Sequence, residues 1–412
     1  MCGMREVPSS STSCREHHDD GASTPAIGLP SDGNSLVSRL LPATWYSVRF
    51  TAPVETGRGA LSGPALAGSN RGRIEHFDRS TGRCALLPRW LASLRRRVFH
   101  IKAVTRRLLA EHGVPSASSY LAQDADHGVK IARRLGYPVV VKPRGRAGSA
   151  GVLRADSDDD VREAFHHALV DSVLGLEAWS VTGALVEEYL QGPEIGVETV
   201  VCAPGQIRIV AVTRKTLGPE PQFQEIGHSV DAADPLLHDS ALAGVVTAAA
   251  RALRLSRGVL HIELRLTSDG PRVIEVNGRP AGDLIPLLVE RATGVNLPQA
   301  LAVLAAGGTP DLAPTRSEAA AIGFLYPEHT GYLEQFDVHG AMRHQLWLER
   351  LVWTRDLGTQ VTAAPRSSID DRIAHWVVTG PTAADCAIRR DMVADHLSVC
   401  VSRPAHTTSC AK

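Results

Sequence analysis

From residue 100 onward, apolar and polar residues recur with the spacings of helices and strands. The segment "IKAVTRRLLAEHGV" has apolar residues at helical spacing and ends at Gly113, with Pro115 beyond it, as is typical of a helix C-terminus. The same spacing predicts helices in "HGVKIARRLG", "SDDDVREAFHHAL" and "DSALAGVVTAAARALRL", and two more after residue 282. Apolar runs predict strands in "YPVVVKP", "ALVEEYL", "EIGVETVV" and "QIRIVAVTR". This mixture indicates an α+β fold.

The two ends of the chain have weaker patterns. Residues 1–96 are rich in Ser, Gly, Pro and Arg, and they show no βαβ pattern, so we expect an atypical and mostly poorly ordered segment. "LPRWLASLRRR" within it indicates an amphipathic helix. Residues 313–406 have strand patterns at "AAIGFLY" and "HWVVTG" and helical patterns at "MRHQLWLERLV" and "PTAADCAIRRDMVADHL". They predict a small α+β lobe.

Composition narrows the class of partner. The 412 residues are 43% hydrophobic and carry a formal net charge of +0, which favours neither nucleic acid nor an anionic membrane as partner. No stretch approaches the ~20 apolar residues that span a bilayer, and the first 20 residues lack the apolar core of a signal peptide. The seven cysteines form no CxxC pair, so neither a disulfide framework nor a zinc site is indicated. We expect a cytoplasmic protein that acts on small molecules.

Two acidic side chains are predicted to face each other in "HIELRLTSDGPRVIEVNGRP", residues 261–280. Asp269-Gly270 is a strong turn signal, and a three-residue loop, Ser268 to Gly270, sets Glu263 opposite Glu275. The face that carries this pair is polar, and the other face is apolar. The polar face holds His261, Glu263, Arg265, Glu275 and Asn277, and the apolar face holds Ile262, Leu264, Leu266, Ile274 and Val276. Opposed like charges repel, but a hard divalent cation such as Mg²⁺ would hold both carboxylates. A solvent-exposed hairpin face is the alternative.

A lysine and a glycine-rich loop form a second candidate site. The strand "YPVVVKP" brings Lys142 to its end, and Gly145, Gly148 and Gly151 follow. Glycines let backbone N–H groups approach phosphate oxygens, and a nearby lysine adds a positive charge. The loop matches neither the P-loop nor the GxGxxG pattern, and a mobile surface loop is the alternative reading.

A third candidate is "ALVEEYLQGPEIGVETVV", two strands around a Gly-Pro turn with glutamates among apolar residues. The backbone at a strand edge can pair with an adenine, and a carboxylate can accept hydrogen bonds from ribose hydroxyls. An ordinary hairpin with charged outer positions is the alternative.

Taken in order, these pieces resemble the ATP-grasp superfamily over residues 100–310. "EVNGRPAGDLIP" is most similar to the carboxylate–amine ligase branch that includes L-amino-acid ligases and carnosine-synthase-like proteins. The resemblance implies an α+β ATP-grasp fold, in which two subdomains grip ATP. The implied domain boundaries are 1–96 for a degenerate N-terminal region, 97–312 for the ATP-grasp domain with a lid near 114–188, and 313–406 for the C-terminal lobe.

The resemblance also implies a role for each matching residue. Lys102 and Lys142 would contact the ATP phosphates, and Ser149 and Gly151 would cover them. Glu187, Tyr189 and Leu190 would hold adenine, and Glu194 would bind ribose. Glu263, Glu275 and Asn277 would hold one or two Mg²⁺, with Mn²⁺ as an alternative. Arg279, Lys215 and His228 would act at the reacting groups.

The implied reaction joins an acid, expected to be an amino acid, to an amine. ATP would convert the carboxylate to an acyl-phosphate, the amine would displace phosphate to form an amide or dipeptide, and ADP would be released. Two alternatives stay open: activation of bicarbonate, as in biotin carboxylases, and a nucleotide-binding protein without catalysis. The sequence names neither substrate, and a homodimer is only the common default for soluble oligomers.

Overall fold

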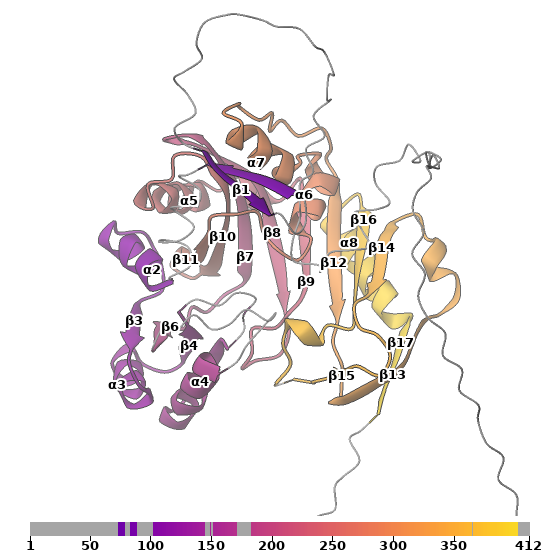
Figure 1. Cartoon of the computed structure of the whole chain (residues 1–412), viewed down its shortest axis with the longest axis horizontal. Coiled ribbons are helices and arrows are strands. Elements are labelled where there is room, and N and C mark those ends of the chain that lie inside the picture. Colours follow the sequence, from indigo (N-terminus) through magenta and orange to yellow (C-terminus); the bar gives the residue numbers. More distant parts are fainter. Residues whose placement is uncertain are drawn as a thin grey trace, which may run out of the picture. The chain divides into compact units, whose positions relative to one another are not determined.

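The computed structural model describes residues 73–78, 83–88, 102–144, 149, 151–170, 183–364 and 366–402. At the centre of the described residues is an eight-stranded antiparallel sheet with strand order β11-β10-β7-β8-β9-β12-β16-β14 (Figure 1). Its strands are β7 (Glu194–Ala203), β8 (Gln206–Leu217), β9 (Glu225–Asp231), β10 (Gly258–Thr267), β11 (Gly270–Asn277), β12 (Ala319–Leu325), β14 (Leu348–Trp353) and β16 (Ala374–Gly380). Neighbouring strands are joined over most of their length by antiparallel pairing.

Helices cover both faces of this sheet. On one face, α5 (Ser240–Ala252) packs its buried leucine, valines and alanines against Ile195, Val197 and Ile262. On the other face, α6 (Ile285–Thr293) and α7 (Leu297–Ala305) pack against residues such as Val200 and Val259. Each methylene group buried in these layers contributes about 0.8 kcal/mol. Alternation along β7 puts charged residues near its start on this second face as well, beyond the apolar part that the helices cover.

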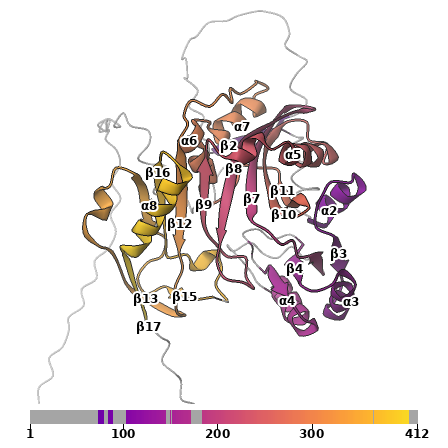
Figure 2. The same cartoon turned by 180° about the vertical axis from the view of Figure 1, so that it is seen from behind.

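A smaller antiparallel sheet with order β3-β6-β4-β5 forms a second α+β unit. Helices α3 (Ala125–Leu135) and α4 (Asp158–Val170) pack together against it (Figure 2). Ser157 caps α4, since its Oγ accepts from the Asp160 N–H at 3.2 Å. The strands are β3 (Ser119–Ala122), β4 (Val139–Pro143), β5 (Leu153–Ala155) and β6 (Ala184–Glu188). Helix α2 (Lys102–Glu111) precedes this unit.

The C-terminal region extends the large sheet and adds a small one. Strands β12, β16 and β14 belong to the eight-stranded sheet, and α8 (Ala383–Asp395) packs against β12 and β16. A three-stranded sheet is formed by β13 (Gly331–Val338), β15 (Gln360–Val361) and β17 (Leu397–Ser402).

The helix expected in "MRHQLWLERLV" was wrong. Those residues include the end of a short 3-10 helix (Gly340–His344) and most of strand β14. The strand pairs with β16, and this pairing satisfies its backbone groups and packs its side chains against a neighbouring strand, which overrides the helical spacing of its apolar residues.

The hairpin of β10 and β11 has the predicted residue pairs but a different turn. Glu263 lies opposite Glu275, and His261 lies opposite Asn277. The turn, however, has two residues, since Thr267 pairs with Gly270, and a bulge next to Glu263 restores the register.

This bulge changes which residue of β11 enters the core. Val273 is fully buried, and Ile274 is only half-buried. The placement of Ile274 on the core face was therefore wrong.

Other predicted elements agree with the structure within a few residues. They include α2, α3, α4, α5, α6, α7, α8 and strands β4, β6, β7, β8, β12 and β16. Between residues 1 and 96 the structure describes one antiparallel pair, β1 (Arg73–Asp78) with β2 (Arg83–Pro88), which the sequence patterns did not predict. The helix expected at 88–97 starts at Pro88, which ends strand β2, and its other residues lie outside the described residues, as do the glycines at 145 and 148. None of the described helices is long and apolar enough to cross a bilayer.

Candidate functional site

A row of charged side chains crosses five strands of the large sheet, on the face and at the end that α6 and α7 leave uncovered. Alternation along the strands puts every second residue on this face, and a register shift between Thr216 and Leu217 adds Glu225, three residues before His228. Its members, called the polar row below, are Glu275 and Asn277 on β11, His261, Glu263 and Arg265 on β10, Glu194 and Glu198 on β7, Lys215 on β8, and Glu225 and His228 on β9.

Lys215 lies at the centre of the polar row. Its Nζ is 2.9 Å from a carboxylate oxygen of Glu194 and 2.8 Å from oxygens of Glu225 and Glu263. Burial alone would lower the pKa of Lys215, but the three carboxylates outweigh it and raise the pKa well above its usual value. Glu263 is affected in the opposite sense: burial opposes its ionisation, and Lys215 and His261 lower its pKa nevertheless. The ammonium group thus neutralises glutamates that would otherwise repel one another.

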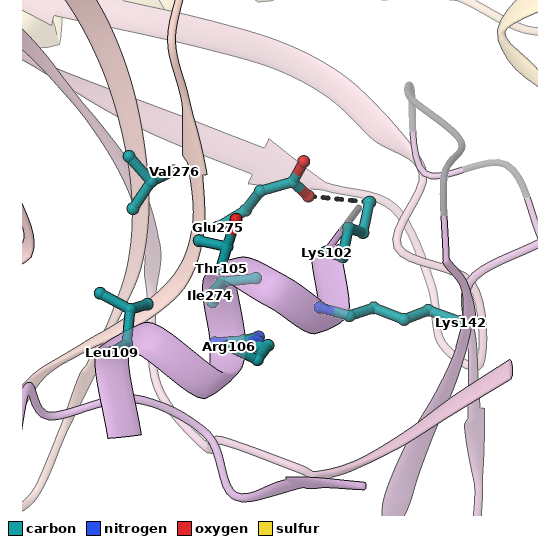
Figure 3. Close-up of a pocket in the computed structure, with 8 residues that line it drawn as sticks. All are labelled: Lys102, Thr105, Arg106, Leu109, Lys142, Ile274, Glu275 and Val276. Carbon is teal, nitrogen blue, oxygen red and sulfur yellow. Dashed lines mark hydrogen bonds and ion pairs between the residues drawn. The ribbon is translucent and has the colours of Figure 1, made fainter. Parts of the chain in front are cut away.

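Lys102 reaches the other end of the row from α2. Its Nζ donates to Glu275 Oε2 at 2.8 Å. Lys102, Glu275 and Lys142 line a small pocket between α2, β4 and β11 (Figure 3). Figure 3 also shows Lys142 extending from β4 toward α2, so that both lysines approach this pocket from different elements. The sequence reasoning expected these two lysines and Glu275 at one site, and the structure brings them together.

Lys142 is one member of a buried charged triad. Its Nζ lies 2.6 Å from Glu187 Oε2, and Arg106 binds the same carboxylate through two nitrogens, at 2.8 and 2.7 Å. Burial and the neighbouring Arg106 lower the pKa of Lys142 to about 8. Burial opposes ionisation of Glu187, but Arg106 and Lys142 outweigh it and lower its pKa to about 2. Glu187 was expected beside adenine, and here its carboxylate holds Lys142 and Arg106.

Arg106 was not singled out from the sequence. It follows Lys102 by four residues on α2, a spacing that puts both on one helix face, and this was the available signal. Its Nη1 also donates to the backbone oxygen of Val273 on β11, at 2.8 Å. Arg106 therefore joins α2, the smaller sheet and the large sheet.

Tyr189 and Leu190 follow the smaller sheet in the segment that leads into β7, and Glu194 is the first residue of β7. The Tyr189 hydroxyl donates to Glu220 at 2.5 Å, and the Leu190 backbone oxygen accepts from Arg265 Nη1 at 3.1 Å. The same guanidinium reaches Glu194 at 3.3 Å and lies over the Tyr189 ring, 5.4 Å from its centroid. The three predicted residues are close together and are organised by Arg265.

The glycine-rich loop is described only in part. Ser149 has φ 55° and Gly151 has φ 68°, and the Val152 N–H donates to the Ser149 oxygen at 3.1 Å, which closes a tight turn. A Cβ on Gly151 would lie 3.1 Å from the backbone oxygen of His167. Glycine at 151 thus allows the turn to approach α4.

A second charged group lies beyond Lys215, where β9 meets the start of α6. His228 Nε2 is 3.3 Å from Asp283 Oδ2 and 3.5 Å from Glu225 Oε2, and the His228 side chain is fully buried. Arg372, from the segment before β16, binds Asp283 through two nitrogens at 2.6 and 3.0 Å. Burial opposes the ionised form of Asp283, but Arg372 and His228 lower its pKa well below the usual value. His228 was predicted. Asp283 and Arg372 were not, and Arg372 stands 89 residues away from its partner with no local signal.

The backbone before α6 is shaped to present Asp283. Asp283 and Leu284 have φ of 52° and 59°, a left-handed backbone conformation that residues other than glycine seldom adopt. Leu284 is buried in the core, and Asp283 makes the ion pairs described above. The strained turn thus directs one side chain into the core and the other into the charged group.

Arg279, which was predicted to act at the reacting groups, lies in the segment between the end of β11 and α6. Its Nη1 donates to the Pro280 oxygen at 3.0 Å. It comes two residues after Asn277, the last residue of β11.

The donor set of Glu263, Glu275 and Asn277 fits a hard divalent cation. All three sit on adjacent strands of the same hairpin, and their oxygens are the ligands that Mg²⁺ and Mn²⁺ prefer. Asn277 Nδ2 donates to Glu263 Oε1 at 3.0 Å, which orients the amide.

Among the described residues, two groups of acidic and histidine side chains have their ligand atoms within 4.8 Å of one another. They are Glu194 with Glu225 and Glu263, and Glu225 with His228 and Asp283. Lys215 already neutralises the first group, and Arg372 neutralises the second. Lysines pair with the hairpin set as well, since Lys215 binds Glu263 and Lys102 binds Glu275.

Comparisons with known proteins agree with this architecture. The model of the ATP-grasp domain family matches residues 135–286. An uncharacterised protein of Sinorhizobium fredii is 33% identical over 240 residues, which is 57% of this chain and 48% of that protein. A phosphoribosylamine–glycine ligase of Streptococcus pneumoniae is 27% identical over 202 residues, 47% of each chain. This chain thus spans about half the length of the curated relatives it matches.

Among solved structures, an L-amino acid ligase from Bacillus licheniformis is similar, with a TM-score of 0.60 and 22% identity over 74% of this chain and 72% of that one. At this identity the likeness concerns the fold. The predicted fold class is therefore confirmed: the chain has the mixed α+β ATP-grasp fold, and its residues 135–286 match the ATP-grasp domain family.

Proposed function

We propose that this chain is a Mg²⁺- and ATP-dependent carboxylate–amine ligase that activates an acid as an acyl-phosphate. We further propose that the acid is an amino acid. An amine then displaces phosphate, so a C–N bond forms as the C–O bond to phosphate breaks, and ADP and phosphate are released. The observation that carries the proposal is the continuity of the polar row. At one end of the row lie Lys102 and Lys142, and next along it come the oxygen donors Glu263, Glu275 and Asn277. At the other end, His228 lies in a buried group with Asp283 and Arg372.

At the phosphate end, the chain supplies positive charge on separate elements. Lys102 from α2 and Lys142 from β4 would bind ATP phosphate oxygens, with Ser149 and Gly151 in the loop that covers them. Glu187 would act indirectly, because its carboxylate fixes the Lys142 ammonium.

The nucleoside part of ATP would lie where the smaller sheet leads into β7. Tyr189, Leu190 and Glu194 would receive adenine and ribose there. Arg265 contacts all three residues, so it would keep this part of the site in shape before the nucleotide binds.

Glu263, Glu275 and Asn277 would hold Mg²⁺, which neutralises charge on the transferring phosphate when bound. In the structure Lys102 and Lys215 balance the two glutamates, so these lysines must release them at least in part when the metal and nucleotide arrive.

Arg279, shortly after Asn277 in the chain, would contact the phosphate or acyl-phosphate. Its guanidinium can bind two phosphate oxygens at once. Catalysis by such a site is mainly positioning and charge neutralisation.

At the far end, the Glu225, His228, Asp283 and Arg372 group would receive the acid and amine. Carboxylates suit an ammonium group, and a guanidinium suits a carboxylate, so this mixed group suits a zwitterionic amino acid. Because Arg372 comes from the C-terminal region, that region would complete the substrate site.

The test is release of ADP and phosphate by the full chain in the presence of ATP, Mg²⁺ and pairs of amino acids, with mass spectrometry of the amide product. Product with at least one pair, and none without ATP, is expected. ATP hydrolysis that depends on bicarbonate and is stimulated by biotin would instead favour the carboxylase alternative. ATP binding with no turnover under any condition would favour a non-catalytic nucleotide-binding protein.

A further inference from the structure

His261 lies between two carboxylates, one fully buried and one partly exposed. Its Nδ1 is 2.7 Å from Glu198 Oε1, and its Nε2 is 3.6 Å from Glu263 Oε1. Glu198 is fully buried and His261 is 5% exposed, whereas the Glu263 side chain is 19% exposed at the site. The short contact of Nδ1 with Glu198 fixes which edge of the ring faces Glu263.

The protein makes room for this ring at one position. A Cβ on Gly196 would lie 2.5 Å from His261 Cε1, closer than side-chain contacts allow. The φ of Gly196 is not in the left-handed region, so the backbone does not require glycine there. The ring does. Glu198 is held in turn by Thr213, whose Oγ1 donates to Glu198 Oε1 at 3.3 Å, while Glu198 Oε2 has no hydrogen-bond partner among the described residues.

Glu263 is thereby surrounded on both carboxylate oxygens. Oε1 accepts from Asn277 at 3.0 Å and faces His261, and Oε2 accepts from Lys215 at 2.8 Å. Lys215 must loosen when a metal binds in the proposed function, whereas His261 and Asn277 approach the oxygen on the other side.

We propose that His261 is a positioning residue that fixes the metal-binding orientation of Glu263, and that Glu198 and Gly196 serve to place His261. The proposal rests on the proposed function, since Glu263 is taken there as a metal ligand. Groups that orient metal-binding side chains typically contribute about 10–100-fold to metal affinity.

The experiment measures Mn²⁺ binding by electron paramagnetic resonance, on the full chain with a non-hydrolysable ATP analogue. The variants are His261→Asn, Glu198→Gln, which keeps the volume of the side chain, and Gly196→Ala, which displaces the ring while keeping both partners. Gly244→Ala is the matched control, because a Cβ there meets no atom within 4 Å. Circular dichroism checks folding.

We expect Mn²⁺ affinity about 10–100-fold lower in the three variants and unchanged in the control, with metal-free nucleotide affinity the same in all. Equal Mn²⁺ affinity in a folded Glu198→Gln protein and the wild type would overturn the proposal. A ¹⁴N coupling to Mn²⁺ that disappears in His261→Asn would also overturn it, since His261 would then be a ligand itself. If the wild type binds no Mn²⁺ with nucleotide, the proposed function fails first, and the positioning role fails with it.

Discussion

Glu263 and Glu275 lie directly opposite each other on β10 and β11, and each is bound to a different lysine at 2.8 Å, Lys215 and Lys102. Opposed carboxylates on neighbouring strands destabilise a hairpin unless a positive charge lies between or beside them. In the structure the two lysines supply that charge. They come from β8 and α2, so the hairpin is stabilised only within the assembled fold.

Glu275→Ala should remove one proposed metal ligand and the partner of Lys102. We expect turnover to fall by about 10²-fold or more, the scale for losing a group that stabilises developing charge. Steady-state release of ADP is the measurement, and Glu328→Ala, an exposed acid in the C-terminal region, is the control. Near-normal turnover of Glu275→Ala would exclude Glu275 as a ligand.

The affinity for ATP should depend on the charge of Lys142. Because the pKa of Lys142 is lowered to about 8, its ammonium form predominates at pH 7 and is lost as the pH rises through 8. Between pH 7 and pH 9 we expect ATP binding to weaken about tenfold, equivalent to about 1.4 kcal/mol. Calorimetry over this range tests it. Lys142→Arg should remove the pH dependence, and a wild type with pH-independent binding would contradict the prediction.

Arg106→Met should destabilise the fold strongly, because it leaves Glu187 with one buried partner in place of two. Breaking a buried ion pair typically costs about 3–5 kcal/mol, so we expect a loss of that size in urea unfolding. The neighbouring Arg107 offers a matched control: its side chain is 69% exposed and pairs with Glu111, so Arg107→Met should change stability by less than about 1 kcal/mol. An equal loss of stability in Arg106→Met and Arg107→Met would refute the role of burial.

Arg372→Met should weaken binding of the acid or amine without weakening binding of ATP. It removes the bidentate partner of Asp283, so the Michaelis constants for acid or amine should rise at least about tenfold, the scale of about 1.4 kcal/mol, with ATP affinity unchanged. Arg355→Met is the control, since Arg355 bonds backbone oxygens within the same region. Loss of ATP affinity in Arg372→Met would place Arg372 at the nucleotide instead.

Local sequence patterns predicted most helices and the pairing of β10 with β11, because apolar spacing and turn chemistry act over a few residues. They did not predict the bulge beside Glu263, which compensates for a shorter turn and exchanges Ile274 for Val273 in the core. They also assigned a helix to β14, since its apolar residues fit helical spacing and only pairing with β16 makes it a strand.

The sequence by itself determined the α+β class, the polar face of the hairpin and a set of residues that the ATP-grasp resemblance joins into one site. Tertiary structure decided which charges meet. Lys215 neutralises three glutamates from three strands, Arg106 shares Glu187 with Lys142, and Arg372 reaches Asp283 across 89 residues. Such partners are chosen by strand order and register, and these depend on contacts between segments far apart in the chain.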